Sequence, residues 1–282
     1  MVHETGFLAA PAPLAFAHRG GAGRRAENTI TTFSRAVELG YRYVETDVQA
    51  TADGVAVLLH DDTLTRVFGH PGRVDDLRWA DLRSLRVADA AAVPRLDEVL
   101  GAWPQIRLNL DAKSDRAVAP MVDAVRRLGA GQRVLLAAFS DARLARIRRL
   151  VGPGVATSMG VRTVARLVLA AHLGRPMRVP AGVVAAQVPV RSGPMPVVTP
   201  RFVRYCHAMG LQVHVWTVDD PTEMHRLLDL GVDGIMTDQL DVLRDTLVSR
   251  GVWPGAAVGG ADRGRPVRRS GGRPWASPRP DA

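Results

Sequence analysis

Short runs of Val, Ile, Leu and Ala recur along the chain and alternate with longer segments whose apolar residues recur at helical spacing. This alternation is typical of a parallel sheet wrapped by helices, because each parallel strand is reached by a crossover connection. Nine runs have the length and composition of strands: 14–17, 43–48, 55–59, 106–110, 134–138, 155–158, 183–188, 211–215 and 234–236. The helix-length stretches between them include 28–40, 115–129, 141–151, 200–210 and 221–231.

The second and third runs are too close together for a parallel crossover, which needs about a dozen residues. Their connection contains Asp53-Gly54, a pair that favours a tight turn, so the third run is predicted to return antiparallel to the second. Eight strands then remain for a barrel. The pattern therefore predicts an α/β fold, a TIM (β/α)8 barrel with an extra β-hairpin strand after the second barrel strand. Short helices are expected within 75–100.

The chain is expected to contain one folded domain and a tail. Residues 1–252 are predicted to form the barrel, since such barrels commonly take about 250 residues. Residues 253–282 are rich in Gly, Pro and Arg, with six Arg and two Asp, and are predicted to be a disordered basic tail. The rest of the formal charge of +9 is spread along the chain, so no nucleic-acid partner is expected. A tail that tethers the protein to nucleic acid or a membrane remains the alternative.

No apolar run approaches the length of about 18 residues that a membrane span needs, so stable membrane insertion is not expected. The first residues lack a basic segment ahead of an apolar one, and we therefore predict a cytoplasmic location. Cys206 is the only cysteine, which excludes an internal disulfide. Nothing in the pattern indicates an oligomeric state.

Acidic residues are placed where two barrel strands end, which is where TIM barrels carry their active sites. Glu45 and Asp47 are two residues apart on the second strand and share a face, and Asp111 is placed similarly on the next barrel strand. Three carboxylates at close range require a compensating charge, and a hard divalent cation, Mg²⁺ or Ca²⁺, is the usual solution. Zinc is not indicated, because no Cys cluster or His pair has the spacing of its ligands. Salt bridges to barrel arginines are the alternative.

Basic residues accompany these acids. His18 and His60 end two different strands, and imidazoles titrate near neutral pH, so we predict that they form an acid/base pair. Arg19 has the planar fork that suits a phosphoryl oxygen. Lys113 is the only lysine among 37 cationic side chains and would add a point charge to the same anion. Together these residues predict a site that stabilises charge on phosphorus.

Several short motifs occur in a fixed order between about residues 16 and 247. With them the chain resembles the glycerophosphodiester phosphodiesterases: His18-Arg19-Gly20, Glu27-Asn28-Thr29, Glu45-x-Asp47, Asp53-Gly54, His60-Asp61 and the closing Gly231-Val232-Asp233-Gly234-Ile235-Met236-Thr237-Asp238. The resemblance implies metal-dependent hydrolysis of glycerophosphodiesters to glycerol 3-phosphate and an alcohol. It also implies attack on phosphorus by the neighbouring glycerol hydroxyl, giving a cyclic phosphate that water then opens.

The resemblance also implies individual roles. It places the metal at Glu45, Asp47 and Asp111, and it implies that His18 and His60 are the general acid and base, with Arg19 on the phosphate. The chain departs from the family at Asp111, because the family's Glu-x-Lys motif is here Asp111-Ala112-Lys113, a carboxylate one methylene shorter. With this shorter side chain, the cation is expected to lie nearer that strand or to bind it through water.

Four further residues are candidate substrate ligands: Glu27, Asn28, Gln187 and Trp216. Asn28 is interpreted either as the cap of the following helix or as a substrate ligand. Trp216 is interpreted either as an apolar wall for the substrate or as rim packing.

Two other functions stay open. A related barrel enzyme of the phospholipase C or D type would act on intact phospholipid, but aromatic residues are 5% of the chain and no aromatic-rich loop is evident, which favours water-soluble diesters. A non-enzymatic anion-binding barrel is the other alternative, although a binder needs no acid/base pair.

Overall fold

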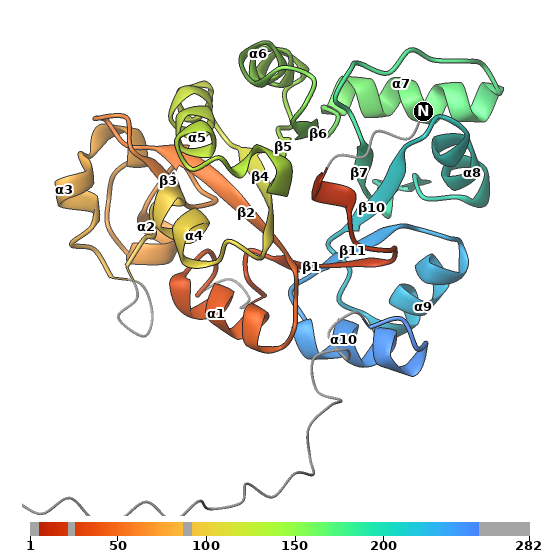
Figure 1. Cartoon of the computed structure of the whole chain (residues 1–282), viewed down its shortest axis with the longest axis horizontal. Helices are drawn as coiled ribbons and strands as arrows, with labels where there is room; N and C mark the ends of the chain where they lie inside the picture. Colours follow the sequence, from red (N-terminus) through yellow and green to blue (C-terminus); the bar gives the residue numbers. More distant parts are fainter. Residues whose placement is uncertain (1–5, 22–25, 87–91, 254–282) are drawn as a thin grey trace, which may run out of the picture.

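Eight parallel strands form a barrel in the computed structural model, which describes residues 6–21, 26–86 and 92–253 (Figure 1). Hydrogen-bonded ladders connect them in the order β6-β5-β4-β2-β1-β11-β10-β7. A parallel bridge between Thr157 and Val183 joins the β6 and β7 sides of this sheet. The strands are β1 (Leu14–His18), β2 (Tyr43–Ala50), β4 (Arg107–Ala112), β5 (Val134–Ala137), β6 (Ala156–Thr157), β7 (Ala185–Pro189), β10 (Gln212–Trp216) and β11 (Gly234–Thr237). The predicted TIM barrel is confirmed.

The extra strand is also where the pattern predicted it. β3 (Ala56–Leu58) pairs antiparallel with β2, with Val48 opposite Leu58. Gly54 in the connection has φ +78°, a conformation that glycine adopts without strain. The Asp53-Gly54 pair therefore predicted the hairpin correctly.

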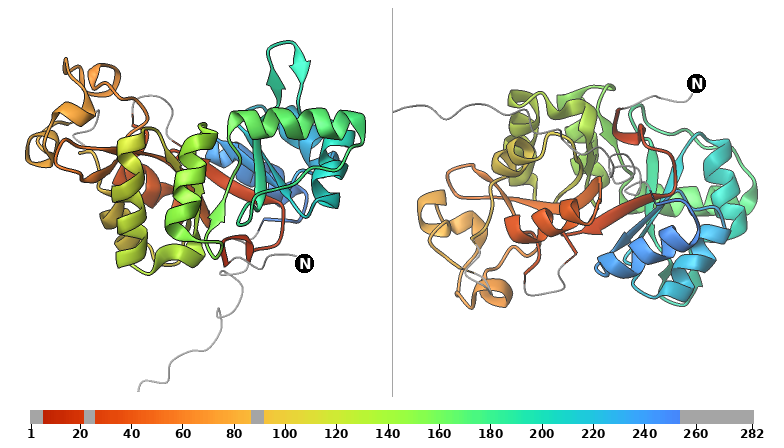
Figure 2. Two further views of the ribbon diagram at one scale, coloured as in Figure 1. Left: turned by 90° about the horizontal axis from the view of Figure 1, so that it is seen from above. Right: turned by 60° about the horizontal axis from the view of Figure 1, so that its bottom comes forward.

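Helices connect the strands and cover the barrel (Figures 1 and 2). The predicted helices are present. Helix α6 (Asp141–Val151) has the predicted bounds, and the others are slightly shorter: α1 (Ile30–Glu38), α5 (Asp115–Arg127), α8 (Pro200–Ala208) and α9 (Pro221–Asp229). Most begin at a Ser, Thr or Asp whose side chain accepts a hydrogen bond from the first turn, as Ser140 does for α6. The 75–100 stretch contains short helices, as expected: η2 (Val74–Asp76), α3 (Trp79–Leu82) and the start of α4 (Leu96–Ala102).

Other elements lacked a clear signal in the sequence. They are η1 (Gly6–Leu8), α2 (Thr65–Phe68), η4 (Ala130–Arg133), α7 (Val161–Leu173), the hairpin of β8 (Arg191–Ser192) and β9 (Met195–Pro196), and α10 (Leu240–Ser249). In the left view of Figure 2 the β8–β9 hairpin projects beyond the barrel next to α7.

Aromatic packing closes the end of the barrel where the strands begin. Phe7 of η1 is fully buried, and its ring packs edge-on against Tyr43 at a centroid distance of 5.3 Å. The Tyr43 hydroxyl donates to the Phe7 carbonyl oxygen at 2.8 Å, and Phe16 packs on the same ring. The large cleft of the described residues lies at the opposite end, where the strands finish.

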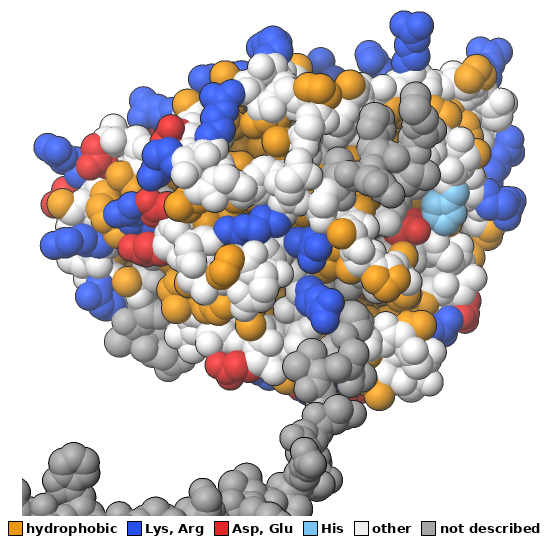
Figure 3. Space-filling view, viewed as in Figure 1, with side chains coloured by type: hydrophobic (Ala, Val, Ile, Leu, Met, Phe, Trp, Pro, Cys, Tyr) orange, Lys and Arg blue, Asp and Glu red, His pale blue; other side chains and the backbone are white. Residues whose placement is uncertain are grey.

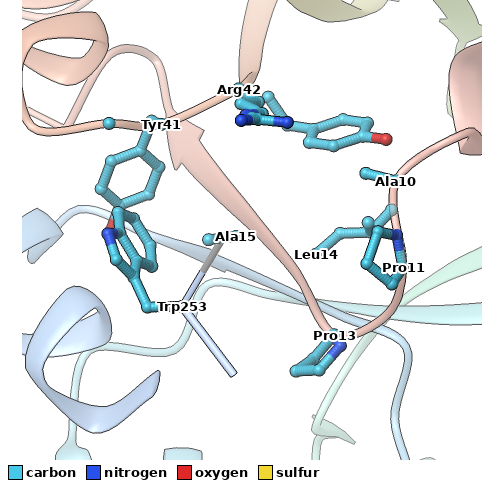
Figure 4. A pocket seen from close by; sticks show the side chains of 10 residues that line it. Ala10, Pro11, Pro13, Leu14, Ala15, Tyr41, Arg42 and Trp253 are labelled. Atoms are coloured by element: carbon cyan, nitrogen blue, oxygen red, sulfur yellow. The ribbon is translucent and has the colours of Figure 1, made fainter. Parts of the chain in front are cut away.

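The described chain ends at Trp253, whose ring lies against Tyr41 at a centroid distance of 5.1 Å (Figure 4). Residues 254–282, nearly all of the predicted basic tail, lie outside the described residues, so the division into barrel and tail stays a prediction. Among the described residues, no helix is both long and apolar enough to cross a membrane. On the face drawn in Figure 3, basic side chains are scattered and form no single patch.

Candidate active site

A cleft of about 1010 Å³ opens where the barrel strands end. Nine of the sequence-predicted site residues line it, from β1, β2, the end of β3, β4, β7 and β10: His18, Arg19, Glu45, Asp47, His60, Asp111, Lys113, Gln187 and Trp216. Glu27 and Asn28 are buried next to the wall and contact lining residues. The structure therefore brings the predicted residues together in one place.

Strand register places the acidic residues side by side. Glu45 of β2 is paired with His18 of β1 and with Asn109 of β4, and Asp47 is paired with Asp111. All of these carboxylates are buried, which disfavours their charged forms. Burial and the neighbouring Asp47 raise the pKa of Glu45 to about 7.

Lys113 lies between two of the carboxylates, with its Nζ 2.9 Å from Asp47 Oδ1 and 3.0 Å from Asp111 Oδ2. Burial works against ionisation of Asp47, but Lys113 and Arg19 outweigh it and lower the pKa of this carboxyl. Burial raises the pKa of Asp111, because Lys113 compensates only in part. The only lysine of the chain thus partly neutralises the acidic cluster.

The donor set fits a hard cation. Oδ1 of Asp111 and Oδ1 of Asn109 are buried and have no hydrogen-bond partner among the described residues. Buried oxygens without partners are costly, and a cation with oxygen ligands would satisfy them. No group of three His, Cys, Asp or Glu side chains in the described ranges has ready metal-binding geometry. Lys113 holds Asp47 and Asp111, so an incoming cation has to compete with its ammonium.

His18 is oriented by a residue that the sequence analysis did not single out. Its Nδ1 lies 2.8 Å from Asp238 Oδ1, and its Nε2 is 3.8 Å from Glu45 Oε2. A carboxylate can only accept, so Nδ1 donates and Nε2 is left facing the cleft. Burial alone would lower the pKa of His18, but the bond to Asp238 and the charge of Glu45 raise it.

His60 is held in the same manner by a longer chain of contacts. Its Nδ1 lies 2.6 Å from Asp61 Oδ1, and the other oxygen of Asp61 accepts from Arg66 Nε at 2.5 Å. Arg66 also donates to Glu27 at 2.5 Å, and Glu27 accepts from Arg19 at 3.2 Å. Burial raises the pKa of Asp61, but hydrogen bonds from Arg66 and His60 lower it to about 2.

The turn after β1 places Arg19 and Asn28 in unusual conformations. Their φ angles are +51° and +57°, and the backbone N–H of Asn28 donates to the Arg19 carbonyl oxygen at 2.9 Å. Left-handed backbone at a residue other than glycine is uncommon and clusters at functional sites. Arg19 thereby turns back over the acids, where its Nε lies 3.1 Å from Asp47 Oδ2.

The cap interpretation of Asn28 is wrong. The cap of α1 is Thr29, which forms a capping box with Thr32. The side chain of Asn28 is used elsewhere, because it donates to Asp47 at 3.1 Å and accepts from Thr46 at 2.7 Å. The sequence alone could not decide the cap, because Asn28 and Thr29 are adjacent and both residue types commonly cap helices.

The side of the cleft near β7 and β10 is different in character. Trp216 packs on Phe139 at a ring-centroid distance of 5.7 Å, and the Lys113 ammonium lies 5.5 Å from the Phe139 centroid. Gln187 lies 3.4 Å from Nδ1 of His214, whose pKa burial lowers to about 3. Apolar residues from α7 and the β8–β9 hairpin continue this wall.

Comparisons with known proteins identify the family and the fold. A model of the glycerophosphoryl diester phosphodiesterase family matches residues 18–242. A Mycobacterium tuberculosis protein named probable glycerophosphodiester phosphodiesterase 2 is 44% identical over 89% of this chain and 96% of its own. The human lysophospholipase D GDPD1 is 26% identical over 82% of this chain and 84% of its own. A glycerophosphodiester phosphodiesterase structure from Parabacteroides distasonis aligns with a TM-score of 0.69 and 25% identity, over 86% of this chain and all of that one.

Proposed function

This chain belongs to the glycerophosphoryl diester phosphodiesterase family, and we propose that it hydrolyses glycerophosphodiesters to glycerol 3-phosphate and an alcohol with the help of a divalent cation. The observation that carries this proposal is the placement of His18 and His60 in one cleft beside three buried carboxylates. Each imidazole has its Nδ1 on a carboxylate, so each has Nε2 free to exchange a proton with the substrate.

Glu45, Asp47 and Asp111 are the residues that would hold Mg²⁺ or Ca²⁺, with Asn109 supplying a further oxygen. A bound cation supplies positive charge that stabilises the phosphoryl oxygens in the transition state. Arg19 and Lys113 border the same cluster and contribute charge-assisted contacts to the phosphate. One histidine accepts the proton of the attacking hydroxyl, and the other protonates the leaving alkoxide.

In this scheme, Glu27 and Asn28 hold other residues of the site in place. Glu27 holds Arg19 and Arg66, and Asn28 fixes Asp47. Gln187 and Trp216 line the other side of the cleft and are proposed to contact the substrate there. A cytoplasmic location and the absence of a nucleic-acid partner stay predictions.

The deciding experiment measures release of glycerol 3-phosphate from a panel of glycerophosphodiesters, with and without a chelator, for the wild type and His18→Ala. We expect chelation and His18→Ala each to abolish turnover, with circular dichroism unchanged. His225→Ala, at a partly exposed position of α9 outside the cleft, is the matched control and should retain wild-type turnover. Turnover that survives in chelator would remove the cation from the proposal, and turnover by His18→Ala would remove the imidazole.

A further inference from the structure

One side of the barrel carries positive charge without any acidic residue. Residues 142–218 contain eleven Arg and neither Asp nor Glu, so all 28 acidic side chains of the chain lie elsewhere. This stretch includes most of α6, all of α7 and α8, and the β8–β9 hairpin. Helix α7 contacts both α6 and α8, and the three helices are neighbours in Figure 1. The formal charge of +9 is therefore distributed less evenly than its spread along the chain indicated.

The arginines of this stretch also lack acidic partners at the surface. Nine of the eleven are exposed, and none of these nine forms an ion pair with a residue of the described ranges. On α9 and α10, by contrast, surface arginines are paired: Arg226 with Glu223, Arg250 with Asp229 and Arg244 with Asp245. Charges without internal partners attract opposite charge from outside the protein. The stretch 142–218 therefore favours an anionic partner.

Exposed apolar side chains are concentrated on the same side of the barrel. Five large apolar residues there are more than half exposed: Phe139, Val161, Leu169, Leu173 and Met195. Among the described residues, Val248 of α10 is the only other large apolar residue with this exposure. The backbone N–H of Val161 donates to the Phe139 carbonyl oxygen at 2.9 Å, so Phe139 lies directly beside the start of α7. Clustered apolar side chains in solvent indicate an interaction surface.

Helix α7 combines charge and apolar exposure on its solvent side. Four exposed residues at spacings of four, three and four share one side of this helix: Arg162, Arg166, Leu169 and Leu173. The residues that pack on the core lie on other sides of the helix: Val164, Leu167, Val168 and Ala171. Leucines on such a stripe can enter lipid, while the long arginine side chains reach the headgroups. The stripe therefore has the composition of a helix that lies on a membrane surface.

We propose that the protein docks on an anionic lipid bilayer through a docking face, which consists of the exposed side of α7 with Phe139 and Met195. A nucleic acid would match the charge but would leave the apolar side chains without a partner, so the composition favours lipid. Four residues of the docking face also line the cleft, so docking turns the mouth of the cleft toward the headgroups: Phe139, Val161, Leu169 and Met195. The proposal goes beyond hydrolysis and does not depend on it, because docking needs neither the cation nor the imidazoles.

Sedimentation of the full chain with vesicles provides the first test. Binding is compared for vesicles of phosphatidylcholine alone and of phosphatidylcholine with an equal amount of phosphatidylglycerol, each at low and at high salt. We expect binding to the anionic vesicles only, and we expect it to weaken as salt rises, because salt screens the arginines. Equal binding to both kinds of vesicle, or binding to neither, would overturn the proposal.

Charge reversal on α7 separates the docking face from the remaining positive charge. The double variant Arg162→Glu, Arg166→Glu is compared with Arg42→Glu, Arg83→Glu, which removes as much charge from exposed positions outside residues 142–218. One basic residue near an anionic surface strengthens binding about fivefold, so the α7 variant should bind anionic vesicles about 25-fold more weakly. The control should lose clearly less. Equal losses would show that only net charge matters and would contradict a defined docking face.

Leu173→Glu and Val248→Glu test the apolar part of the docking face. Leu173 and Val248 are 52% and 53% exposed, both lie in the last turn of a helix, and neither lines the cleft. We expect Leu173→Glu to weaken binding to anionic vesicles about tenfold, because a leucine can no longer enter the lipid. Val248→Glu should bind like the wild type, and both variants should hydrolyse glycerophosphocholine in solution normally. Identical vesicle affinities of the two variants would refute the docking face.

Other partners of the docking face would give different results. If the α7 charge reversal weakens binding of a DNA duplex and Leu173→Glu changes neither DNA nor vesicle binding, the partner is a nucleic acid and the proposal is wrong. If Leu173→Glu converts a dimer into a monomer in analytical ultracentrifugation and leaves vesicle binding unchanged, the face is an interface between copies of the chain. That result would refute the proposal as well.

Vesicle binding by His18→Ala in chelator separates docking from the proposed catalytic function. We expect this variant to bind anionic vesicles like the wild type, although it lacks turnover. If wild-type turnover is absent and the docking variants still bind more weakly, the catalytic proposal fails and docking stands. If turnover is normal and the docking variants bind vesicles like the wild type, docking alone is refuted.

Discussion

The two sides of the cleft differ in how their side chains are satisfied. On the side of β1, β2 and β4, polar groups hold one another: Lys113 is bound by Asp47 and Asp111, and the imidazoles of His18 and His60 are each held by a carboxylate. On the side of α7 and the β8–β9 hairpin, apolar groups such as Leu169 and Met195 stay exposed. The first side is therefore arranged for charged groups, whereas the second exposes apolar surface to the solvent.

This difference predicts which kinetic parameter the residues of each side should affect. Groups that are fixed before the substrate arrives can stabilise a transition state without reorganising, so their loss should lower kcat. Groups that gain contacts only with the ligand should change the preference among substrates. The predictions below test this division, starting with the largest effect.

His60→Ala should lower kcat at least about 10³-fold for every glycerophosphodiester of the panel alike, because all of them need the same proton transfer. The measurement is kcat for each substrate, with unfolding temperature as a check on folding. His225→Ala is again the control. A loss confined to some of the substrates would mean that His60 recognises the ligand and does not act in the common chemical step.

Asp238→Asn should lower kcat about 10²-fold with little change in KM. Asn can offer its amide to Nδ1 of His18 and so favour the wrong tautomer, although it fills the same space. The pH profile should also change, because the carboxylate contributes to the raised pKa of His18. Asp241→Asn, at a half-exposed carboxylate on α10, is the control. A purely structural role for Asp238 would lower stability and leave the pH profile of the remaining activity unchanged.

Most of the charged side of the cleft could be predicted from the sequence, but the contribution of Asp238 could not. Strand-end residues such as Glu45 and Asp47 are separated by the period of a strand, so the pattern itself gives their common face. Asp238 was visible only as part of a motif, because its contact with His18 spans 220 residues and depends on the β1–β11 pairing. Arg66 was also missed, because it lies in a short helix without a periodic signal.

The apolar side could not be predicted, for a different physical reason. A helix that lines a cleft with Val164 and Val168 has the same 3.6-residue period as one that covers a core. Which face meets solvent is decided by the tertiary position of α7 beside α8 and the hairpin (Figure 2). The sequence therefore could not show that Val164 and Val168 line the cleft while they also pack, partly buried, against the main core.

Glu45→Gln should abolish activity and yet stabilise the metal-free protein. The pKa of Glu45 is about 7 in the folded state against an ordinary 4.5, so the folded protein binds this proton more tightly than the unfolded chain. The free energy of unfolding therefore falls as pH rises from about 4.5 to 7, and the neutral amide of the variant would escape this loss. We expect the variant to gain about 2 kcal/mol at pH 8 and nothing at pH 4.

Urea denaturation in chelator at both pH values measures this difference. Glu223→Gln, which removes a partly exposed carboxylate paired with Arg226, is the control and should not stabilise the protein at pH 8. An equal stability gain for Glu45→Gln at pH 4 and pH 8 would show that ionisation of Glu45 is not its source. Leu169→Glu, from the apolar side, should change the free energy of unfolding by less than about 0.5 kcal/mol at either pH.

The smallest expected effect concerns Phe139, which contacts both sides of the cleft. Its ring lies 5.5 Å from the Lys113 ammonium and 5.7 Å from Trp216. An exposed cation–π contact contributes about 0.5–1 kcal/mol, so losing the ring should lower kcat/KM for glycerophosphocholine about threefold by releasing Lys113. Phe139→Leu keeps an apolar side chain at this position but removes the π face. It should therefore reduce turnover of glycerophosphocholine and retain binding to anionic vesicles, whereas Phe139→Ser should reduce both. If Leu and Ser give the same pattern, the ring does not link Lys113 to the apolar side, and the two sides of the cleft act independently.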